Sequence, residues 1–324
     1  MKKSILVVGG AGYIGSHIVH EFLKAGYAVS VFDNMSSGQQ INLFEEATFI
    51  HGDIQDRILL KDVFSQHFDA VVHLAGLKAA GESMIIPEAY AYQNINGTLN
   101  LLEAISHSST RTVVFSSSAA VYGMPQYLPI DEEHPISPIN FYGFTKREIE
   151  RFLEWYDQIK EIKFASLRYF NAAGYHPEGK VKGLENNPAN LIPIVMEVAA
   201  GKRKTMDVFG DDYPTKDGTG VRDYIHVSDL ASAHLKVFEH IKKTHQSITL
   251  NLGTGVGYSV LEIINMTEKV TQKKVNYQIV PRRAGDPAEL YAKSEMAESC
   301  MGWKPQYSDL ETLIRSTWEV YRNQ

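Results

Sequence analysis

The chain has 324 residues, and its 38 acidic and 32 basic side chains give a formal net charge of −6. At roughly 100 to 200 residues per domain, this length predicts one large domain or two modest ones. Hydrophobic residues make up 44% of the chain and charged residues 22%, which excludes a disordered protein and indicates a buried core. The mild acidity and the absence of a long basic run exclude a nucleic-acid partner, which would require a positive surface.

The cysteine count and the first residues bear on the compartment. Cys300 is the single cysteine, so an intramolecular disulfide is impossible and a reducing compartment is favoured. Two lysines followed by the apolar run 5–8 imitate a secretory signal, but the glycines that follow fit a turn from a strand into a helix better. No apolar stretch approaches the roughly 20 residues of a membrane-spanning helix. We therefore expect a cytoplasmic protein with no membrane partner.

Secondary structure alternates regularly through the first half of the chain. Short runs rich in valine, isoleucine and phenylalanine predict strands at 4–8, 28–33, 48–51, 70–74, 112–116 and 164–168. Amphipathic patterns predict helices at 14–25, 59–66, 87–106 and 144–160. Strands in this order read as nearly continuous apolar runs when helices cover both faces of a parallel sheet. The expected fold class is therefore α/β, with a doubly wound parallel sheet of the Rossmann type.

The pattern changes after about residue 175. Prolines, glycines and asparagines crowd the segment before an apolar helix predicted at 191–200, and a second loop-rich segment covers 211–220. We expect residues 1–175 to form the sheet domain and residues 176–324 to form a smaller C-terminal α/β lobe that closes a cleft against it. Whether the chain crosses between these lobes more than once stays open.

A glycine motif joins the first predicted strand to the first predicted helix. Gly9, Gly12 and Gly15 fit the spacing of a dinucleotide-binding turn, in which the backbone approaches a diphosphate and the helix N-terminus offers free N–H groups. Asp33 closes the second strand 18 residues later, where a carboxylate can accept hydrogen bonds from the adenosine ribose. Its charge would repel a 2′-phosphate, so NAD is favoured over NADP. Asp53 follows the third strand and could face the adenine, although a plain turn fits that position as well.

A tyrosine and a lysine four residues apart suggest acid–base chemistry. Tyr142 and Lys146 project from one face of a predicted helix. Bringing a tyrosine from its reference pKa near 10 to about 7 requires roughly 4 kcal/mol of phenolate stabilisation, which an ammonium and an oxidised nicotinamide can supply together. Upstream, a parallel strand ends at the serine run 116–118, and a hydroxyl there can bind the reacting oxygen. The pair could therefore take a proton from a hydroxyl while hydride leaves the same carbon.

Several motifs together resemble the extended short-chain dehydrogenase/reductase superfamily and, within it, the UDP-glucose 4-epimerase family. They are the glycine motif at 9–15, Asp33-Asn34, His73-Leu74-Ala75-Gly76 with Lys78, Ser116-Ser117-Ser118, Val121-Tyr122-Gly123, and Tyr142 with Lys146. Further matches lie at 167–171, 211–215, 218–227 and 281–286, so the resemblance covers nearly the whole chain. It implies an enzyme that holds NAD tightly, oxidises carbon 4 of a UDP-hexose, and returns hydride to the opposite face of the 4-keto sugar.

The resemblance also implies roles for individual residues. Ser118, Tyr142 and Lys146 take the catalytic positions. The positions that contact NAD are Gly9, Gly12, Tyr13, Ile14, Gly15, Asp33, Asn34, Asp53, Ile54, Leu74, Ala75, Gly76, Lys78, Asn94, Tyr142, Lys146 and Phe170. The positions that contact the UDP-sugar are Ser118, Tyr142, Asn171, Asn190, Leu191, Phe209, Arg222, Arg283, Asp286 and Leu290. We expect no metal ligands, NAD binding by residues 1–175, and UDP-sugar binding mainly by residues 176–324.

Related reactions begin with the same oxidation and need separate consideration. Dehydratases of this superfamily place an acid and a base directly after the catalytic hydroxyl residue, where this chain has Ala119 and Ala120, so dehydration is disfavoured. Decarboxylation is disfavoured too, because this chain has no obvious acidic residue next to Ser118. A non-catalytic NAD sensor would not need both Tyr142 and Lys146. Leu290 lies where a bulky tyrosine is associated with exclusion of N-acetylated sugars. We therefore expect activity on UDP-glucose and UDP-galactose first, and some on the N-acetyl forms.

The resemblance implies a homodimer as well. Such enzymes usually pair through two helices per subunit, which correspond here to 89–106 and 144–160. The apolar side chains of these helices could equally pack on the sheet of one subunit, so the sequence leaves both uses open; they include Tyr92, Leu99, Leu102, Phe152, Leu153 and Trp155.

Overall fold

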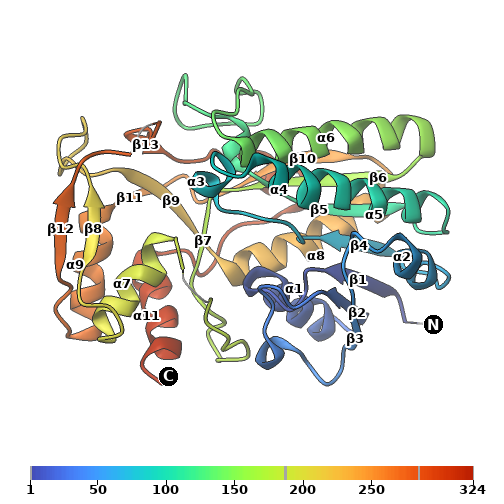
Figure 1. Ribbon diagram of the computed structural model, residues 1–324, viewed down its shortest axis with the longest axis horizontal. Coiled ribbons are helices and arrows are strands. Elements are labelled where there is room, and N and C mark those ends of the chain that lie inside the picture. The colour runs from blue at the N-terminus through green and yellow to red at the C-terminus, as the bar shows by residue number, and fades with distance from the viewer. Residues whose placement is uncertain (1, 186–187, 284, 324) are drawn as a thin grey trace.

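A parallel sheet forms the larger part of the molecule, which is described here from a computed structural model (Figure 1). The described residues are 2–185, 188–283 and 285–323. Among them, seven parallel strands pair in the order β10-β6-β5-β4-β1-β2-β3. The strands are β1 (Ser4–Val8), β2 (Ala28–Asp33), β3 (Thr48–His51), β4 (Ala70–His73), β5 (Thr112–Ser118), β6 (Lys163–Tyr169) and β10 (Ile248–Leu252). The predicted doubly wound sheet is confirmed, and the first three strands have the predicted bounds.

Helices cover both faces of this sheet. On one face, α1 (Tyr13–Lys24) and α8 (Val227–Thr244) pack on it, with α10 (Glu295–Met301) beside β10. On the other face lie α2 (Arg57–Val63), α5 (Gly97–Ser106) and α6 (Phe141–Lys160). Both faces of the inner strands are therefore apolar; β1, for example, buries its last four residues completely. This two-sided burial explains why the strands read as continuous apolar runs.

The strand order reverses between β1 and β4. The chain proceeds from β1 to β2 and β3 on one side, and from β4 to β5 and β6 on the other. In an open parallel sheet, such a reversal leaves a crevice at the carboxyl ends of the two strands, where ligands bind. The glycine motif follows β1 and Leu74 follows β4, so both lie at this crevice.

The helix predicted at 87–106 is continuous but not uniform. It begins as α4 (Pro87–Tyr90), widens into a π-helical stretch, η2 (Ala91–Asn96), and continues as α5. The π-helical stretch carries the buried Asn94. Stretches of this kind occur most often at functional sites, and the hydrophobic pattern of the sequence does not distinguish them from an α-helix.

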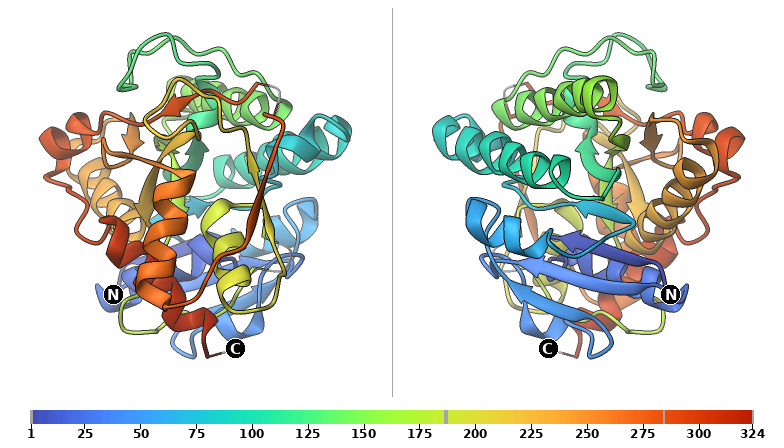
Figure 2. Two further views of the ribbon diagram at one scale, coloured as in Figure 1. Left: turned by 90° about the vertical axis from the view of Figure 1, so that its left-hand side faces the viewer. Right: turned by 90° about the vertical axis from the view of Figure 1, so that its right-hand side faces the viewer.

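The rest of the chain forms a smaller lobe, which faces the viewer in the left view of Figure 2. Its described residues form a four-stranded sheet, a two-stranded parallel sheet and three helices. The strands are β7 (Asn171–Ala173), β9 (Val221–His226), β11 (Gly257–Ser259) and β13 (Glu289–Leu290), then β8 (Met206–Phe209) and β12 (Tyr277–Val280); the helices are α7 (Leu191–Ala199), α9 (Val260–Thr271) and α11 (Leu310–Tyr321). The chain returns from this lobe to the large sheet through α8 and β10. The boundary near residue 175 stays a prediction.

Short helical turns connect these elements. They are η1 (Gln40–Asn42), α3 (Ala80–Ser83) and η3 (Ala119–Val121). No helix among the described residues combines the length and the apolar character needed to cross a membrane.

Candidate active site

The turn between β1 and α1 is packed so tightly that Gly9 and Gly15 cannot be replaced by a residue with a Cβ atom without a shift. A Cβ atom on Gly15 would lie 2.1 Å from the carbonyl oxygen of Gly9, and Gly9 itself has a φ of +87°. Gly12 is the N-cap residue of α1 and contributes no side-chain cap, so none competes for the N–H groups of Tyr13 and Ile14. The start of α1 therefore presents N–H donors and the positive end of the helix dipole, a donor set that suits a diphosphate.

Asp33, at the end of β2, organises the backbone beside this turn. Its carboxylate accepts a hydrogen bond from the N–H of Ala11 at 2.9 Å and another from the N–H of Met35 at 2.8 Å. Next to it, the Asn34 amide donates to the Asp53 carboxylate at 2.7 Å. Two oxygens of a carboxylate offer about four acceptor sites, so Asp33 retains capacity for ribose hydroxyls. The three polar residues thus lie together at the ends of β2 and β3.

The segment after β4 is held by the π-helical stretch. The Asn94 side-chain oxygen accepts from the N–H of Leu77 at 2.7 Å, and its amide donates to Leu77 O at 3.0 Å. A Cβ on Gly76 would lie 2.8 Å from the same side-chain oxygen, so only glycine fits there. The first residues of the segment are also hydrogen-bonded to the end of β1, because Leu74 N and Ala75 N both donate to Val8 O. Asn94 therefore fixes the loop that leads to Lys78, whose ammonium pairs with Glu185.

The proposed acid–base residues meet at the end of β5. The Lys146 ammonium, only 4% exposed, donates to the carbonyl oxygen of Ser116 at 2.7 Å and lies 5.7 Å from the ring centre of Tyr142. The hydroxyl of Ser118 lies close enough to the Tyr142 phenol to influence its pKa. Burial lowers the pKa of Lys146 to about 8, and the carboxylate of Glu150 opposes this effect. Burial raises the pKa of the Tyr142 phenol, while the hydroxyl of Ser118 lowers it.

These shifts show what the protein alone provides. Lys146 keeps its proton at neutral pH, but its charge does not bring the tyrosine down to neutrality. For Tyr142 to act as a base near neutral pH, a second positive charge next to the phenol is needed, and the sequence predicts an oxidised nicotinamide for that place.

In the smaller lobe, five of the predicted substrate residues form two groups. Arg222 on β9 and Leu290 on β13 are paired in strand register, and Arg222 forms an ion pair with Asp286 at 3.4 Å. The guanidinium of Arg283 lies 3.7 Å from the ring centre of Phe209 at the end of β8. Two arginines, an aromatic ring and a carboxylate are a chemical set that suits a nucleoside diphosphate.

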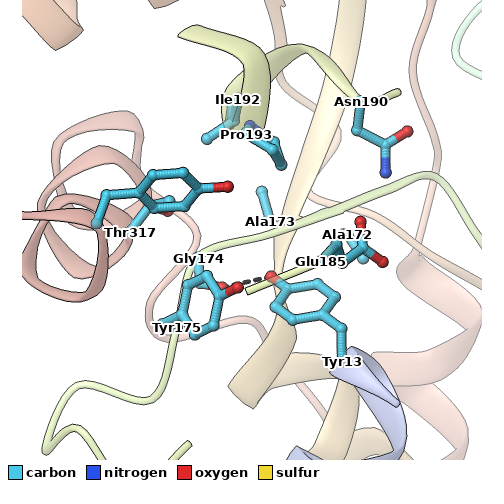
Figure 3. A pocket seen from close by; sticks show the side chains of 11 residues that line it. Tyr13, Ala172, Ala173, Gly174, Tyr175, Glu185, Asn190, Ile192, Pro193 and Thr317 are labelled. Atoms are coloured by element: carbon cyan, nitrogen blue, oxygen red, sulfur yellow. Dashed lines mark hydrogen bonds between the residues drawn. The ribbon is translucent and has the colours of Figure 1, made fainter. Parts of the chain in front are cut away.

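A small cavity lies between the start of α1 and residues of the smaller lobe (Figure 3). The phenol of Tyr13, from the start of α1, donates to the carbonyl oxygen of Gly174, and Tyr175 lies beside it. Asn190, the N-cap residue of α7, lines the same cavity just before Leu191 begins the helix. The cavity therefore brings Tyr13, predicted for the cofactor, and Asn190, predicted for the substrate, to one place.

Two further predicted residues lie where β6 leads into β7. Phe170 N donates to Leu252 O, and its side chain packs against the cluster that contains Ala119. Asn171 donates from its amide to Asp223 O at 2.9 Å, next to Arg222. Ile54 is buried at the other end of the crevice, against the face of α5 that carries Gly97.

Comparison with known proteins decides the family. The model of the NAD-dependent epimerase/dehydratase family matches residues 5–253. The chain belongs to this family. A curated UDP-glucose 4-epimerase of Halalkalibacterium halodurans is 45% identical over 321 residues, which cover 98% of this chain and 96% of the relative.

Solved structures of this family match nearly the whole fold. The UDP-glucose 4-epimerase of Brucella ovis in complex with NAD has a TM-score of 0.96 and 41% identity, covering 99% of this chain and 98% of that one. The UDP-Glc/GlcNAc 4-epimerase of Campylobacter jejuni has a TM-score of 0.87 and 38% identity, covering 99% and 100%. The predicted family, the fold and the dependence on NAD are confirmed. The glycine turn, Asp33 and the cationic Lys146 fit that cofactor.

Several residues that hold this part of the fold together were not among the predicted site residues. Thr145 accepts a hydrogen bond from Asn94, and Ser116 accepts one from Lys146 through its backbone. Glu150 and Arg168 form a buried ion pair behind Lys146. The one available signal was the position of Arg168, a charge within an otherwise apolar predicted strand.

Proposed function

We propose that this chain is a UDP-glucose 4-epimerase that interconverts UDP-galactose and UDP-glucose with tightly bound NAD. The observation that carries this proposal is that Ser118, Tyr142 and Lys146 lie together at the carboxyl ends of the sheet strands. The glycine turn lies at the same end of the sheet. The curated relative and the solved structures named above bear the same activity in their names. The sequence prediction of an NAD-dependent isomerase agrees with them.

The residues divide the chemistry between them. The glycine turn at the start of α1 and Asp33 would hold NAD, which would supply a hydride acceptor for carbon 4 of the sugar and the means to return that hydride. Tyr142 takes the proton of the 4-hydroxyl and later returns it, while Ser118 binds the same oxygen and orients it. Lys146 stabilises the phenolate, because its buried ammonium lies next to the Tyr142 ring. Return of hydride to the other face requires the 4-keto sugar to turn over within the site.

The roles of the binding residues follow the same division. We assign NAD binding to the start of α1, Asp33, Asn34, Asp53, Ile54, residues 74–76, Lys78, Asn94 and Phe170. We assign the uridine diphosphate to Asn190, Leu191, Phe209, Arg222, Arg283 and Asp286, and the hexose to Asn171 and Leu290. The ion pair of Arg222 with Asp286 and the contact of Arg283 with Phe209 support this grouping.

Dehydration is the nearest alternative, and the surroundings of Ser118 argue against it. Ala119 and Ala120 form the η3 turn directly after the catalytic serine. Eliminating water from the sugar requires an acid and a base, and these two residues have no titratable group. Epimerisation needs no further proton donor.

Leu290 bears on the breadth of substrates. Its side chain packs against the cluster of Ala119, Val121, Tyr122 and Ile130, next to Ser118. This contact supports a position at the sugar end of the site. Leucine fills less space than tyrosine, so we propose some turnover of UDP-N-acetylhexosamines in addition to UDP-glucose and UDP-galactose.

We further propose that the enzyme is a homodimer. Of the apolar side chains considered above, Leu102 and Leu153 are buried in the core of the subunit, whereas Tyr92 is 56% and Trp155 is 58% exposed. The helices that carry the two exposed aromatics lie side by side on one face (Figures 1 and 2). A second copy of the chain would cover them. We also propose the cytoplasm as the compartment, because the single cysteine is exposed and free.

The direct test is incubation of the purified protein with UDP-galactose and no added cofactor. Formation of UDP-glucose supports the epimerase. A protein that holds NAD but leaves UDP-galactose unchanged would favour the non-catalytic sensor instead.

A further inference from the structure

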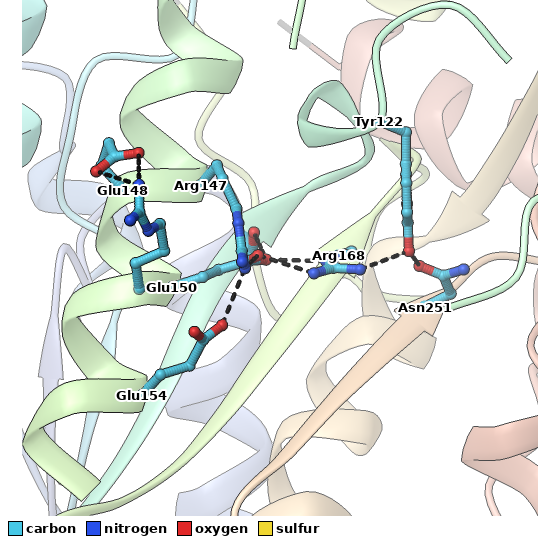
Figure 4. Close-up of polar contacts among 9 residues, drawn as sticks. Tyr122, Arg147, Glu148, Glu150, Glu154, Arg168 and Asn251 are labelled. Carbon is cyan, nitrogen blue, oxygen red and sulfur yellow. Dashed lines mark hydrogen bonds and ion pairs between the residues drawn. The ribbon is translucent and has the colours of Figure 1, made fainter. Parts of the chain in front are cut away.

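A buried bidentate ion pair joins Glu150 on α6 to Arg168 on β6 (Figure 4). Arg168 on β6 donates from Nε to one carboxylate oxygen of Glu150 at 2.9 Å and from Nη2 to the other at 2.8 Å. Arg168 is 4% exposed and Glu150 is 1% exposed. Removing two charges from water is costly even when they are paired, and apolar residues of similar size often stabilise a fold as well. Stability alone is therefore a weak explanation for this pair.

One side of the pair clamps the end of β5. The hydroxyl of Ser117 donates to the carboxylate of Glu150 at 2.6 Å. Ser117 lies between Ser116, whose carbonyl oxygen binds Lys146, and the proposed catalytic Ser118. Glu150 follows Lys146 by four residues, so both project from the same face of α6. Helix α6 and strand β5 are thus joined twice, once through Lys146 and once through Glu150.

The other side of the pair reaches the turn after Ser118. Arg168 Nη1 donates to the phenol oxygen of Tyr122 at 2.9 Å, and the phenol donates to the side-chain oxygen of Asn251 at 2.7 Å. The Asn251 amide in turn donates to Ile130 O at 3.1 Å. Tyr122 closes the η3 turn that begins at Ser118. The network therefore fixes the backbone on both sides of this serine.

The charges around Lys146 are few among the described residues. On α6 it faces Tyr142 and Glu150, and from β5 it faces the ring of Phe115 and a backbone oxygen. From β4 it faces His73, whose pKa is lowered to about 3 by burial and by Lys146, so that imidazole is neutral near pH 7. Glu150 is the carboxylate that influences Lys146.

We propose that Glu150 is a positioning residue for the epimerase reaction. By binding Ser117 and Arg168 together, it sets the placement of α6, with Tyr142 and Lys146, against the end of β5, with Ser118. Its charge also faces the Lys146 ammonium. This inference rests on the proposed function, since positioning has a measurable meaning only for a reaction at these residues.

The test compares E150Q with E154Q. Glu154 lies on the same helix and pairs with Arg147, as Glu150 does, but Glu154 is at the surface. We expect E150Q to reduce kcat for UDP-galactose roughly tenfold or more, with KM changed much less, because misplacement acts on the transition state. Loss of the negative charge also favours neutral Lys146, so the alkaline limb of the kcat–pH profile should move to lower pH. E154Q should leave both unchanged.

The outcomes separate this inference from the proposed function. A folded E150Q with the kcat and the alkaline limb of the wild type would overturn the inference alone. A wild-type protein that does not epimerise UDP-galactose would overturn the proposed function and the inference with it. If E150Q does not fold, S117A decides, because it removes only the hydroxyl that Glu150 binds. A reduced kcat with unchanged KM supports the positioning role, and a wild-type kcat contradicts it.

Discussion

The ammonium of Lys146 donates to the backbone oxygen of Ser116, two residues before Ser118 on the same strand. This bond joins the helix that carries Tyr142 to the strand that carries the proposed catalytic hydroxyl of Ser118. The Lys146 ammonium lies 5.7 Å from the centre of the Tyr142 ring. Because Lys146 is buried, its charge is little screened by water. The relationship between these two residues brings Lys146 to the carboxyl end of β5, next to the proposed catalytic Ser118.

Replacement of Tyr142 by phenylalanine tests the proposed base. It removes only a hydroxyl, so we expect the fold and NAD binding to persist while kcat for UDP-galactose falls roughly 10²- to 10⁴-fold. Tyr156→Phe makes the same change on the same helix, far from Ser118, and should have little effect on kcat. Turnover of Tyr142→Phe at the wild-type rate would show that another group takes the proton.

The pH dependence of kcat tests the role of Lys146. Its pKa is lowered by burial to about 8, so the ammonium dominates below this pH and the neutral amine above it. The neutral form cannot stabilise a phenolate, and kcat should fall as the pH rises through about 8. Lys160→Gln, a change at the end of the same helix, should keep this limb. Lys146→Arg, which stays charged, should remove the limb at a reduced overall rate.

The same shift has the opposite sign for stability. Between about 8 and the ordinary value of 10.5, the unfolded chain holds more protons at Lys146 than the folded chain does. The contribution of Lys146 to the free energy of unfolding therefore increases as the pH rises over this range, while activity decreases.

The Lys146→Arg variant also provides the outcome that would contradict the role of Lys146 in kcat. If its kcat still falls as the pH rises through about 8, another group causes the fall.

Leu290 gives a prediction about substrate breadth. Wild-type enzyme should turn over UDP-galactose well and UDP-N-acetylgalactosamine measurably. Leu290→Tyr adds volume next to the Ala119 cluster and should abolish turnover of the N-acetyl sugar while leaving UDP-galactose within a few-fold. Leu290→Met conserves volume and should keep both activities. No detectable reaction of the wild type with UDP-N-acetylgalactosamine would end the idea of broad specificity.

The assembly can be tested at Trp155. Light scattering should give the mass of two chains for the wild type and of one chain for Trp155→Glu, because a charge in the centre of an apolar interface is costly. Ile58 on α2 is 85% exposed, so Ile58→Glu serves as the control and should stay dimeric. A wild-type protein with the mass of one chain at micromolar concentration would contradict the dimer.

The large sheet was predictable because each inner strand is a short apolar run that ends next to a recognisable motif. Strand β10 was not predicted, since Thr249 and Asn251 interrupt its apolar residues and it lies after the smaller lobe has begun. The strand acquires its place only by pairing with β6. The π-helical stretch around Asn94 was hidden for a related reason, because the pattern of an α-helix covers it.

Candidate site residues could be proposed from the sequence where polar chemistry follows a strand, as at Asp33, or where two reactive side chains share a helix face, as at Tyr142 and Lys146. Arg222 and Arg283 were assigned only through resemblance, because an arginine far along the chain looks like any surface residue. The structure distinguishes them from ordinary surface arginines, because Arg222 forms an ion pair with Asp286 and Arg283 lies over the ring of Phe209. Glu150 was missed because a carboxylate on an amphipathic helix is normally exposed.

The central claim is that hydride leaves carbon 4 of the sugar and returns to the same carbon within one site. UDP-galactose that carries deuterium at carbon 4 tests it most directly, with the product analysed by mass spectrometry and NMR. We expect UDP-glucose that retains the deuterium at carbon 4 without exchange with solvent. Loss of the label to water would show that carbon 4 is deprotonated instead, and would contradict the account.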